Sequence, residues 1–385
     1  MEHFGTVSAS VYGFRPEEVE RAKRYHRPLY AARLAGLALG IAAPAALAFG
    51  RAGGLFDDLP WWAATFALTI IVLGPETLVL FPVSLWRYRR ERAWGFSTQS
   101  PSSWLLDRAK SLGIAAVITW GAFVGLVASV RLFPTWWPLV AAIGGALLVI
   151  LLGFVAPVVL EPVFNRFRPL ADEELADSLR SLADRAGVPV RDVLVADASR
   201  RTRKHNAYVS GLGRTRRVVV WDTLLDDAEP AELRLVVAHE LAHRRFRHVA
   251  WATVLAMVGV AAYVVVLWTA LHWSGLRSAL GVSGAGDPGI VPFALLLGAL
   301  LELPALPAQA ALSRRFERAA DRFSLDLTGD AGAYQSVHRG LATANLSDLD
   351  PPRAFYLVFH GHPTAPERLA AGSVWSGKSE AGVAV

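Results

Sequence analysis

The sequence predicts an α-helical integral membrane protein with about six transmembrane helices and a polar domain that contains a small β-sheet. Of its 385 residues, 53% are hydrophobic, which is more than in an ordinary soluble domain. Six apolar segments each match the roughly 20 residues that cross a bilayer. A long polar stretch over residues 161–248 separates the fourth segment from the fifth. Six buried helices of a soluble protein would need far more polar surface between them.

The apolar segments divide the chain into two parts. Four of them come early, as two hairpins, and predict an N-terminal membrane domain over residues 1–160. Residues 161–385 are expected to form a second domain with two further crossings, at about 249–273 and 290–312. Residues 372–385 have no periodic pattern and are expected to be disordered. The six segments are Leu29–Gly50, Trp61–Trp86, Leu112–Val130, Trp136–Leu160, Val249–Trp273 and Ile290–Leu312.

Basic residues gather in alternate loops, and this sets the expected orientation. The net charge is +6, and the start of the chain, the loop of residues 87–110, the polar stretch and the tail from Arg314 are all basic. The other three loops have only Arg51, Arg131 and Arg277 as basic residues. Because cytoplasmic loops carry an excess of Lys and Arg, both termini and the polar domain are expected on the cytoplasmic side of the cell membrane. No basic tract is interleaved with aromatic residues, so we expect no nucleic-acid partner.

The polar stretch has the pattern of a small α/β unit. Leucines and alanines at helical spacing over residues 171–187 predict a helix that ends on a glycine. Three short strands are predicted at residues 191–197, 206–213 and 216–222. The next helix is predicted to begin near Pro230 and can run into the fifth apolar segment without a break. The segment after the sixth crossing is predicted to be mainly helical.

Three histidines lie within the stretch AHELAHRRFRHV, residues 238–249, in this last helix of the polar region. His239 and His243 lie four residues apart, about 40° around a helix, so both imidazoles can bind one metal ion. Glu240 can reach a water molecule on that ion. His248 falls on the opposite face of a continuous helix and is excluded unless the helix breaks. The chain has no cysteine, so any metal must be held by His, Asp or Glu side chains.

The two histidines need a further protein ligand, because catalytic zinc usually has three protein ligands and one open position. The segment SRRFERAADRFSLDL, which follows the sixth crossing, carries Glu317 and Asp321 at positions i and i+4. Glu317 is a candidate third ligand, and Asp321 is a candidate partner for the outer nitrogen of a ligand histidine. The alternative is that both acids are solvated among four arginines on an exposed helix. Spacing alone leaves both alternatives open.

Several motifs, in order along most of the chain, resemble the type I CAAX prenyl endopeptidases, integral-membrane zinc proteases of the gluzincin type. They are GFSTQSPSSWLLDRAKS, EPVFNRFRPLADEEL, NAYVSGLGRTRRVVVWDTLL, HELAH, FERAADRFS and HPTAPERL. The related HtpX-type heat-shock proteases share the catalytic motifs but are not expected to carry the GFSTQS block. Eukaryotic members of the family have seven spans around a large chamber, so a chain with six leaves open how fully the chamber is enclosed.

The resemblance implies a zinc-dependent endopeptidase with one zinc ion per chain. It assigns His239, His243 and Glu317 as the zinc ligands, and Glu240 as the residue that activates the attacking water. It also places Asp321 beside the site, where it is sometimes assigned as a proton donor.

The resemblance further implies three residues that meet the substrate. His362 and Arg368 would contact the scissile carbonyl or the substrate backbone. Asn206 would lie on an edge strand beside the cleft. Taken without the resemblance, His362 before a proline is an ordinary turn residue and Asn206 a strand-end cap.

The substrate remains open between two classes, and two other functions compete with the main one. CAAX-type peptides and membrane-protein segments are both compatible with a site at the membrane surface, and an HtpX-like quality-control protease would have no CAAX specificity. A non-proteolytic metal-binding membrane scaffold is a remote alternative. A site-2-type intramembrane protease would need an Asp within a later apolar span, and residues 290–312 have none. The expected partners are a peptide or membrane-protein substrate and the lipid bilayer; the sequence does not specify an oligomeric state.

Overall fold

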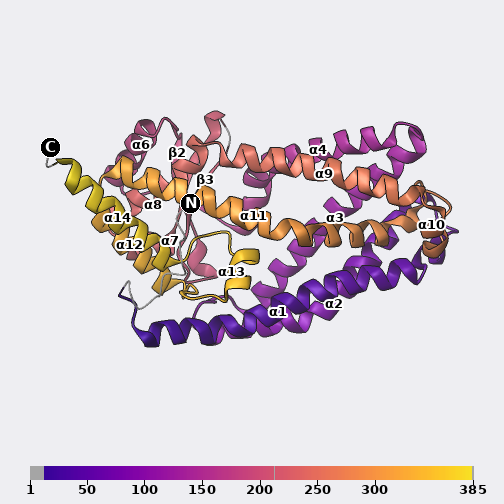
Figure 1. Ribbon diagram of the computed structural model, residues 1–385, viewed down its shortest axis with the longest axis horizontal. Helices are drawn as coiled ribbons and strands as arrows, with labels where there is room; N and C mark the ends of the chain where they lie inside the picture. Colours follow the sequence, from indigo (N-terminus) through magenta and orange to yellow (C-terminus); the bar gives the residue numbers. More distant parts are fainter. Residues whose placement is uncertain (1–12, 212, 384–385) are drawn as a thin grey trace.

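A long helical bundle carries a small α/β unit at one end in the computed structural model, which describes residues 13–211 and 213–383 (Figure 1). Within these residues, six helices are long and apolar enough to cross a membrane. The predicted membrane fold with a small sheet is therefore confirmed. Most of these helices extend beyond the apolar segments, since their polar ends continue past the bilayer. They are α1 (Pro16–Phe49), α2 (Trp61–Ala93), α3 (Pro101–Leu132), α4 (Trp137–Val155), α9 (His248–His272) and α11 (Val291–Thr328).

The membrane helices pack as a bundle around α11. Helix α1 lies along α11, α4 lies along α9, and α2 and α3 form a hairpin (Figure 1). A shared apolar core, which includes Leu68, Val127, Leu267 and Ile290, is almost fully buried where these helices meet. The fourth crossing continues through a π-helical turn, Ala156–Leu160, into α5 (Glu161–Phe164). The division into two domains at residue 160, which falls within this continuous run, stays a prediction.

The α/β unit contains a four-stranded sheet in the order β1-β2-β4-β3. Strands β2 and β4 are parallel, and the two outer strands are antiparallel to their neighbours. Three strands match the predicted ones, whereas β1 was not predicted because it has only three residues and ends on a proline. The strands are β1 (Phe167–Pro169), β2 (Asp192–Ala196), β3 (Ala207–Ser210) and β4 (Arg217–Trp221).

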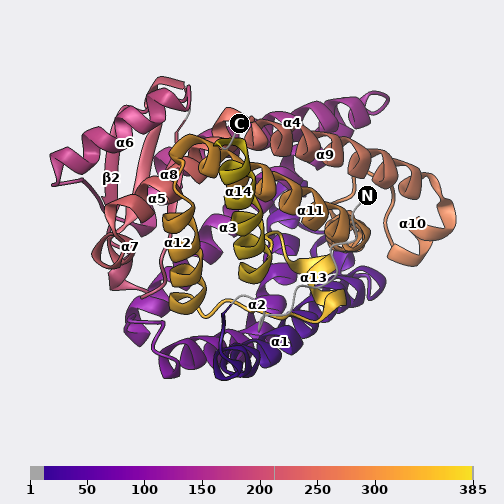
Figure 2. The ribbon, with the colours of Figure 1, turned by 60° about the vertical axis from the view of Figure 1, so that its left-hand side comes forward.

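Helices cover this sheet and complete the polar end of the molecule (Figure 2). The apolar sides of α6 and α8 form one core with the strands, and α12 and α14 pack against each other nearby. The helices of this end are α6 (Glu173–Arg185), α7 (Asp222–Asp227), α8 (Pro230–Arg245), α12 (Ala331–Ala344), α13 (Arg353–Phe359) and α14 (Ala365–Val383). A short helix, α10 (Ser274–Leu280), lies at the opposite end of the bundle (Figure 1).

Strand β3 is an edge strand, and the end of the fourth crossing holds its C-terminal part. The carboxylate of Glu161 accepts hydrogen bonds from the Ser210 hydroxyl at 2.9 Å and the Arg217 guanidinium at 3.3 Å. The Tyr208 hydroxyl lies 3.4 Å from the same carboxylate. The edge strand is thus fixed relative to the membrane helices.

Two sequence expectations differ from the structure. The helix with the histidine pair does not continue into the fifth crossing, because Arg247 adopts a left-handed backbone conformation (φ 57°) and starts a new helix at His248. Helix α14 also continues up to Val383, whereas residues 372–385 were expected to be disordered; the last two of these lie outside the described residues. Contacts with the rest of the chain explain part of this order: the Trp375 indole donates a hydrogen bond to Asp326 at 2.7 Å.

Candidate metal centre and active site

Helix α8 presents the histidine pair because its sequence gives it a defined start and one apolar face. Pro230 occupies its first turn, and Glu229 and Glu232 form a reciprocal capping box. The face that packs under the sheet consists of Leu233, Val237, Ala238 and Leu241, all almost fully buried. With this face fixed in the core, His239 and His243 project toward α11.

Helix α11 brings Glu317 to the two histidines. The Nε2 atoms of His239 and His243 lie 3.2 Å apart, and each lies 3.3–3.4 Å from one carboxylate oxygen of Glu317. One ligand atom from each residue lies within 4.8 Å of the others. Glu317 is 5% exposed, so it is not a solvated surface acid. The structure therefore brings together the three residues that the sequence proposed as metal ligands.

Each histidine has a second partner at its outer ring nitrogen. The Nδ1 atom of His239 lies 2.9 Å from the carboxylate of Asp321, one turn after Glu317 on α11. The Nδ1 atom of His243 lies 3.0 Å from Nδ1 of His248. The sequence excluded His248 only for a continuous helix; the break at Arg247 brings it next to His243, although it is not one of the three converging ligands. Its buried ring also stacks on Phe316, with the centroids 4.1 Å apart.

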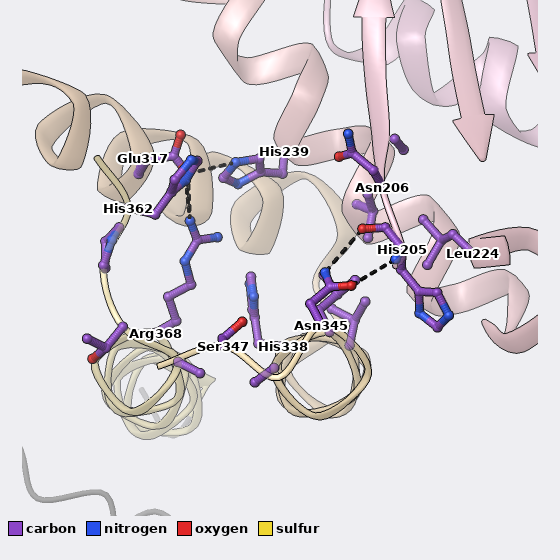
Figure 3. A pocket seen from close by; sticks show the side chains of 18 of the residues that line it. His205, Asn206, Leu224, His239, Glu317, His338, Asn345, Ser347, His362 and Arg368 are labelled. Carbon is purple, nitrogen blue, oxygen red and sulfur yellow. Dashed lines mark hydrogen bonds and ion pairs between the residues drawn. The ribbon is translucent and has the colours of Figure 1, made fainter. Parts of the chain in front are cut away.

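Helix α14 and the loop before it add two further groups (Figure 3). The Arg368 guanidinium donates to Glu317 at 2.5 Å and to Asp321 at 3.0 Å. The Nδ1 atom of His362 lies 2.8 Å from the carboxylate of Glu317. The side chain of Arg368 is 12% exposed, whereas that of His362 is 71% exposed. Arg368 is thus directed at the two buried acids, and His362 remains accessible.

The electrostatics of the cluster favour a positive charge between its acids. Burial disfavours a charged His239, but hydrogen bonds to Asp321 and Glu317 outweigh this and raise its pKa to about 10. Burial, together with the charge of His239, lowers the pKa of His243 to about 4. His243 is therefore neutral at pH 7, the form in which an imidazole binds a metal.

A cavity of about 430 Å³ adjoins the cluster and reaches His239, Glu240 and Glu317. Asn206 and Ala207, at the start of the edge strand, also line it, and Figure 3 shows Asn206 on the side opposite Glu317. Burial raises the pKa of the Glu240 carboxyl above its ordinary value. The structure thus places Asn206 across the cavity from Glu317, as expected for a residue beside a cleft.

Four residues next to the ligand cluster or the edge strand were not singled out as site residues by the sequence. His248 contacts His243, and the buried His338 lies 3.9 Å from Asp321. Asn345 and Arg244 bond the backbone on either side of Ala207. Only the HELAH spacing pointed toward His248 and Arg244, since both follow it closely. The other two lie on α12 or just after it and had no signal in the sequence.

The donor set fits a divalent metal ion. Two imidazole nitrogens and one carboxylate converge, and three protein ligands with an open side are typical of catalytic metal sites. The partners of the outer nitrogens, Asp321 and His248, orient both rings in the way such sites require. The buried acids also supply the negative charge that a cation balances.

The comparisons with known proteins agree with this arrangement. Residues 169–375 match peptidase family M48, and residues 38–166 match the CAAX prenyl protease N-terminal region of five membrane helices. The chain is 30% identical over 314 residues to the uncharacterized metalloprotease YhfN of Bacillus subtilis, covering 79% of this chain and 71% of that protein. It is also 30% identical over 336 residues to CAAX prenyl protease 1 of Saccharomyces cerevisiae, covering 80% and 72%.

A solved structure has the same fold. The crystal structure of S. mikatae Ste24p matches with a TM-score of 0.79 and 25% identity, over 93% of this chain and 89% of that one. Fold, metal-ligand cluster and comparisons together define a membrane metalloendopeptidase. The chain belongs to peptidase family M48, and its matching N-terminal region is that of the CAAX prenyl proteases. It is thus a multi-pass membrane protein whose family implies a divalent metal and peptide substrates.

Proposed function

We propose that this protein is a zinc-dependent endopeptidase that cuts peptide bonds at the cytoplasmic surface of the cell membrane. One observation carries the proposal: His239, His243 and Glu317 converge beside Glu240 at a cavity bounded by an edge strand. These three residues would hold one zinc ion. When bound there, zinc would polarise the scissile carbonyl and lower the pKa of a water molecule toward about 7.

Glu240 would act as the general base and then as the general acid. Its carboxylate takes a proton from the water whose oxygen attacks the carbonyl carbon, and it then protonates the amine nitrogen as the C–N bond breaks. The products are a carboxylate and an amine. Burial raises the pKa of Glu240 above its ordinary value, which favours uptake of the proton that the same group then donates.

The geometry supports different roles for the three remaining side chains. Asp321 is engaged by His239 and Arg368, so we assign it to orienting His239 rather than to proton donation. Arg368 directs its donors at Glu317 and Asp321, so we assign it to positioning these acids rather than to binding the substrate. The exposed His362 is left to donate a hydrogen bond to the carbonyl oxygen of the reacting peptide.

The substrate would be a peptide segment that reaches the membrane surface in an extended form. An edge strand can hold such a segment by backbone pairing, and Asn206, just before that strand, lines the cavity. The names of the yeast, plant and animal relatives suggest C-terminal CAAX peptides. Unmodified membrane-protein segments, as expected for a quality-control protease, are the second class.

A cleavage assay with purified protein tests this function. We expect wild-type protein with about one zinc per chain to cut a prenylated CAAX peptide, an unmodified membrane-protein segment or both. The Glu240→Gln variant should keep its zinc and lose about 10²–10⁴-fold in kcat/KM, the usual contribution of a general base. Glu174→Gln, on the exposed face of α6, is the matched control and should stay fully active.

Each result of this assay decides between the candidate functions. Full activity of Glu240→Gln would exclude the mechanism, and a lack of bound zinc would favour a membrane scaffold. Cleavage of the prenylated peptide alone would identify a CAAX protease. Equal cleavage of both peptides would identify a quality-control protease without CAAX specificity.

A further inference from the structure

The edge strand β3 has one side free to pair with another chain. On its other side it is hydrogen-bonded to β4, and just before the strand the Asn206 carbonyl accepts the Trp221 N–H at 3.0 Å. Backbone groups alternate in direction along an antiparallel strand. The N–H and C=O groups of His205, Ala207 and Val209 therefore point to the free edge. Ala207, the middle of these three, lines the cavity.

Asn345 occupies the first of these three positions. Its side-chain oxygen accepts the His205 N–H at 2.8 Å, and its side-chain nitrogen donates to the His205 C=O at 3.1 Å (Figure 3). A residue of a neighbouring strand would make the same two bonds. The amide of Asn345 therefore stands where a paired peptide would continue past Ala207.

Arg244 occupies part of the third position. Arg244 directly follows His243 on α8, and its guanidinium donates a hydrogen bond to the Val209 C=O at 2.6 Å. Among the residues that the structure describes, Ala207 is then the one residue of this edge whose N–H and C=O are both free of side-chain partners. A peptide can therefore form a full backbone pair with this edge only at Ala207. The side chains of Asn345 and Arg244 occupy the positions on either side.

The amide of Asn345 is held firmly in this position. Asn345 terminates α12, and the following Leu346 adopts a left-handed conformation (φ 48°) and is buried against Tyr25 and Phe96. The carbonyl of Leu346 also lies 2.8 Å from Nε2 of His26. A substrate that displaced Asn345 would gain two hydrogen bonds and break two, so displacement gives no net stabilisation.

We propose that Asn345 is a specificity-determining residue. It blocks the pairing of a bound peptide with β3 beyond Ala207 and so restricts cleavage to sites close to the peptide's C-terminus. A peptide paired antiparallel to β3, the more stable pairing, runs with its C-terminal side toward His205. Its next pairing position after Ala207 lies two residues on, where Asn345 stands. The peptide must therefore end or turn away about two residues beyond that pair. This inference rests on the proposed protease function and deepens it.

The first test is the position of the cuts in a peptide mixture. Tryptic peptides of a denatured soluble protein are incubated with the purified full-length enzyme, and mass spectrometry reads the distance of each cut from the C-terminus. Wild-type cuts should fall within about four residues of that end, the reach of a short extended segment. In Asn345→Ala, the ratio of internal to terminal cuts should rise about tenfold, because a longer peptide can then form the hydrogen bonds at His205 that Asn345 makes in the wild type.

Matched variants separate this role from a structural one. Ser347→Ala changes the same loop and the same cavity, and its cut pattern should equal that of the wild type. Asn345→Ser, which retains a hydroxyl at the end of α12, replaces the alanine variant if that variant loses the fold. Internal cuts by the wild type, or an unchanged pattern in the Asn345 variant, would overturn the proposal.

The second test measures binding without catalysis. A fluorescein-labelled hexapeptide and two versions extended by six residues, one at each end, are titrated into the Glu240→Gln variant. The C-terminal extension should weaken binding about tenfold, and the N-terminal one should not. Adding Asn345→Ala to this variant should abolish the difference. Equal binding of the hexapeptide and its C-terminal extension to the Glu240→Gln variant alone would refute the proposal that Asn345 blocks pairing. If no variant cleaves but this selectivity is present, the protease function fails while the assignment of Asn345 stands.

Discussion

Each histidine of the metal cluster has its outer nitrogen held by a different kind of group, a carboxylate for His239 and a second histidine for His243. The Nε2 atom of His243 can turn its lone pair to a metal only if the ring proton is on Nδ1. The Nδ1–H group then donates a hydrogen bond to His248. His248 must then accept at Nδ1 and carry its own proton at Nε2. This residue thus fixes the tautomer of a proposed ligand.

Replacement of His248 should weaken metal binding without unfolding the protein. In His248→Ala, His243 loses its hydrogen-bond acceptor, and we expect the metal affinity to fall about 10–100-fold, as for other outer partners of ligand histidines. Competition with a metal chelator measures the dissociation constant. His272→Ala, at the exposed far end of the same helix, is the control. Wild-type affinity in His248→Ala would show that the contact is not needed.

At the scale of residues, the sequence predicted most members of the cluster. It did not predict which group orients the ring of His243. The i, i+4 spacing put His239 and His243 on one face, and the structure brings Glu317 and Asp321 to them. Spacing could not show that a later helix returns to the site. It placed His248 on the opposite face of a continuous helix, but it could not show that the helix breaks at Arg247. The chemistry of Asn345 had no signal, since an asparagine after a helix is commonly a cap.

At the scale of elements, the break between α8 and α9 lets one segment serve both the site and the membrane. Helix α8 ends at Arg245, and the left-handed Arg247 redirects the chain into the fifth crossing. A left-handed conformation costs a residue with a side chain about 1–2 kcal/mol, and β-branched residues tolerate it least. The break is therefore maintained against a local cost, and it delivers His248 to His243.

The shape of the Arg247 backbone gives a stability prediction. Arg247→Val should lower the free energy of unfolding by about 1–2 kcal/mol, whereas Arg247→Gly should leave it unchanged or raise it slightly. Thermal unfolding in detergent micelles measures both variants. Arg245→Val makes the same chemical change at the last residue of α8 and isolates the backbone effect. A similar loss in both valine variants would refute the explanation.

Hydropathy and turn residues predicted the elements better than their ends. The six crossings follow from apolar length, β2 and β4 from valine-rich runs, and β3 from a short segment that ends in a glycine turn. The missing strand β1 has three residues and depends on its partner β2 rather than on its own pattern. Helix α14 extends past its expected end partly because Trp375 bonds Asp326, a contact between distant segments that no local pattern records.

At the scale of the whole molecule, α8 and α11, which carry the proposed metal ligands, pack together at the end of the bundle that holds the sheet (Figure 1). Helices α8 and α11 supply the metal ligands although two crossings, α9 and α11 itself, separate these residues along the chain. Hydropathy gives the number of crossings, but it does not show which helices are neighbours. Charge alone bears on the side of the membrane, and it predicts that the site is cytoplasmic.

This orientation can be tested with single cysteines, because the natural chain has none. Asp58→Cys lies in the exposed loop between α1 and α2, and Ser181→Cys lies on the exposed surface of α6 at the opposite end of the bundle. If the basic loops are cytoplasmic, a membrane-impermeant maleimide should label Asp58→Cys in intact spheroplasts and label Ser181→Cys only after lysis. The cysteine-free parent controls for background labelling. The reverse pattern would place the site outside the cytoplasm and would exclude substrates anchored to the inner membrane surface, whereas the cleavage chemistry at Glu240 would be unaffected.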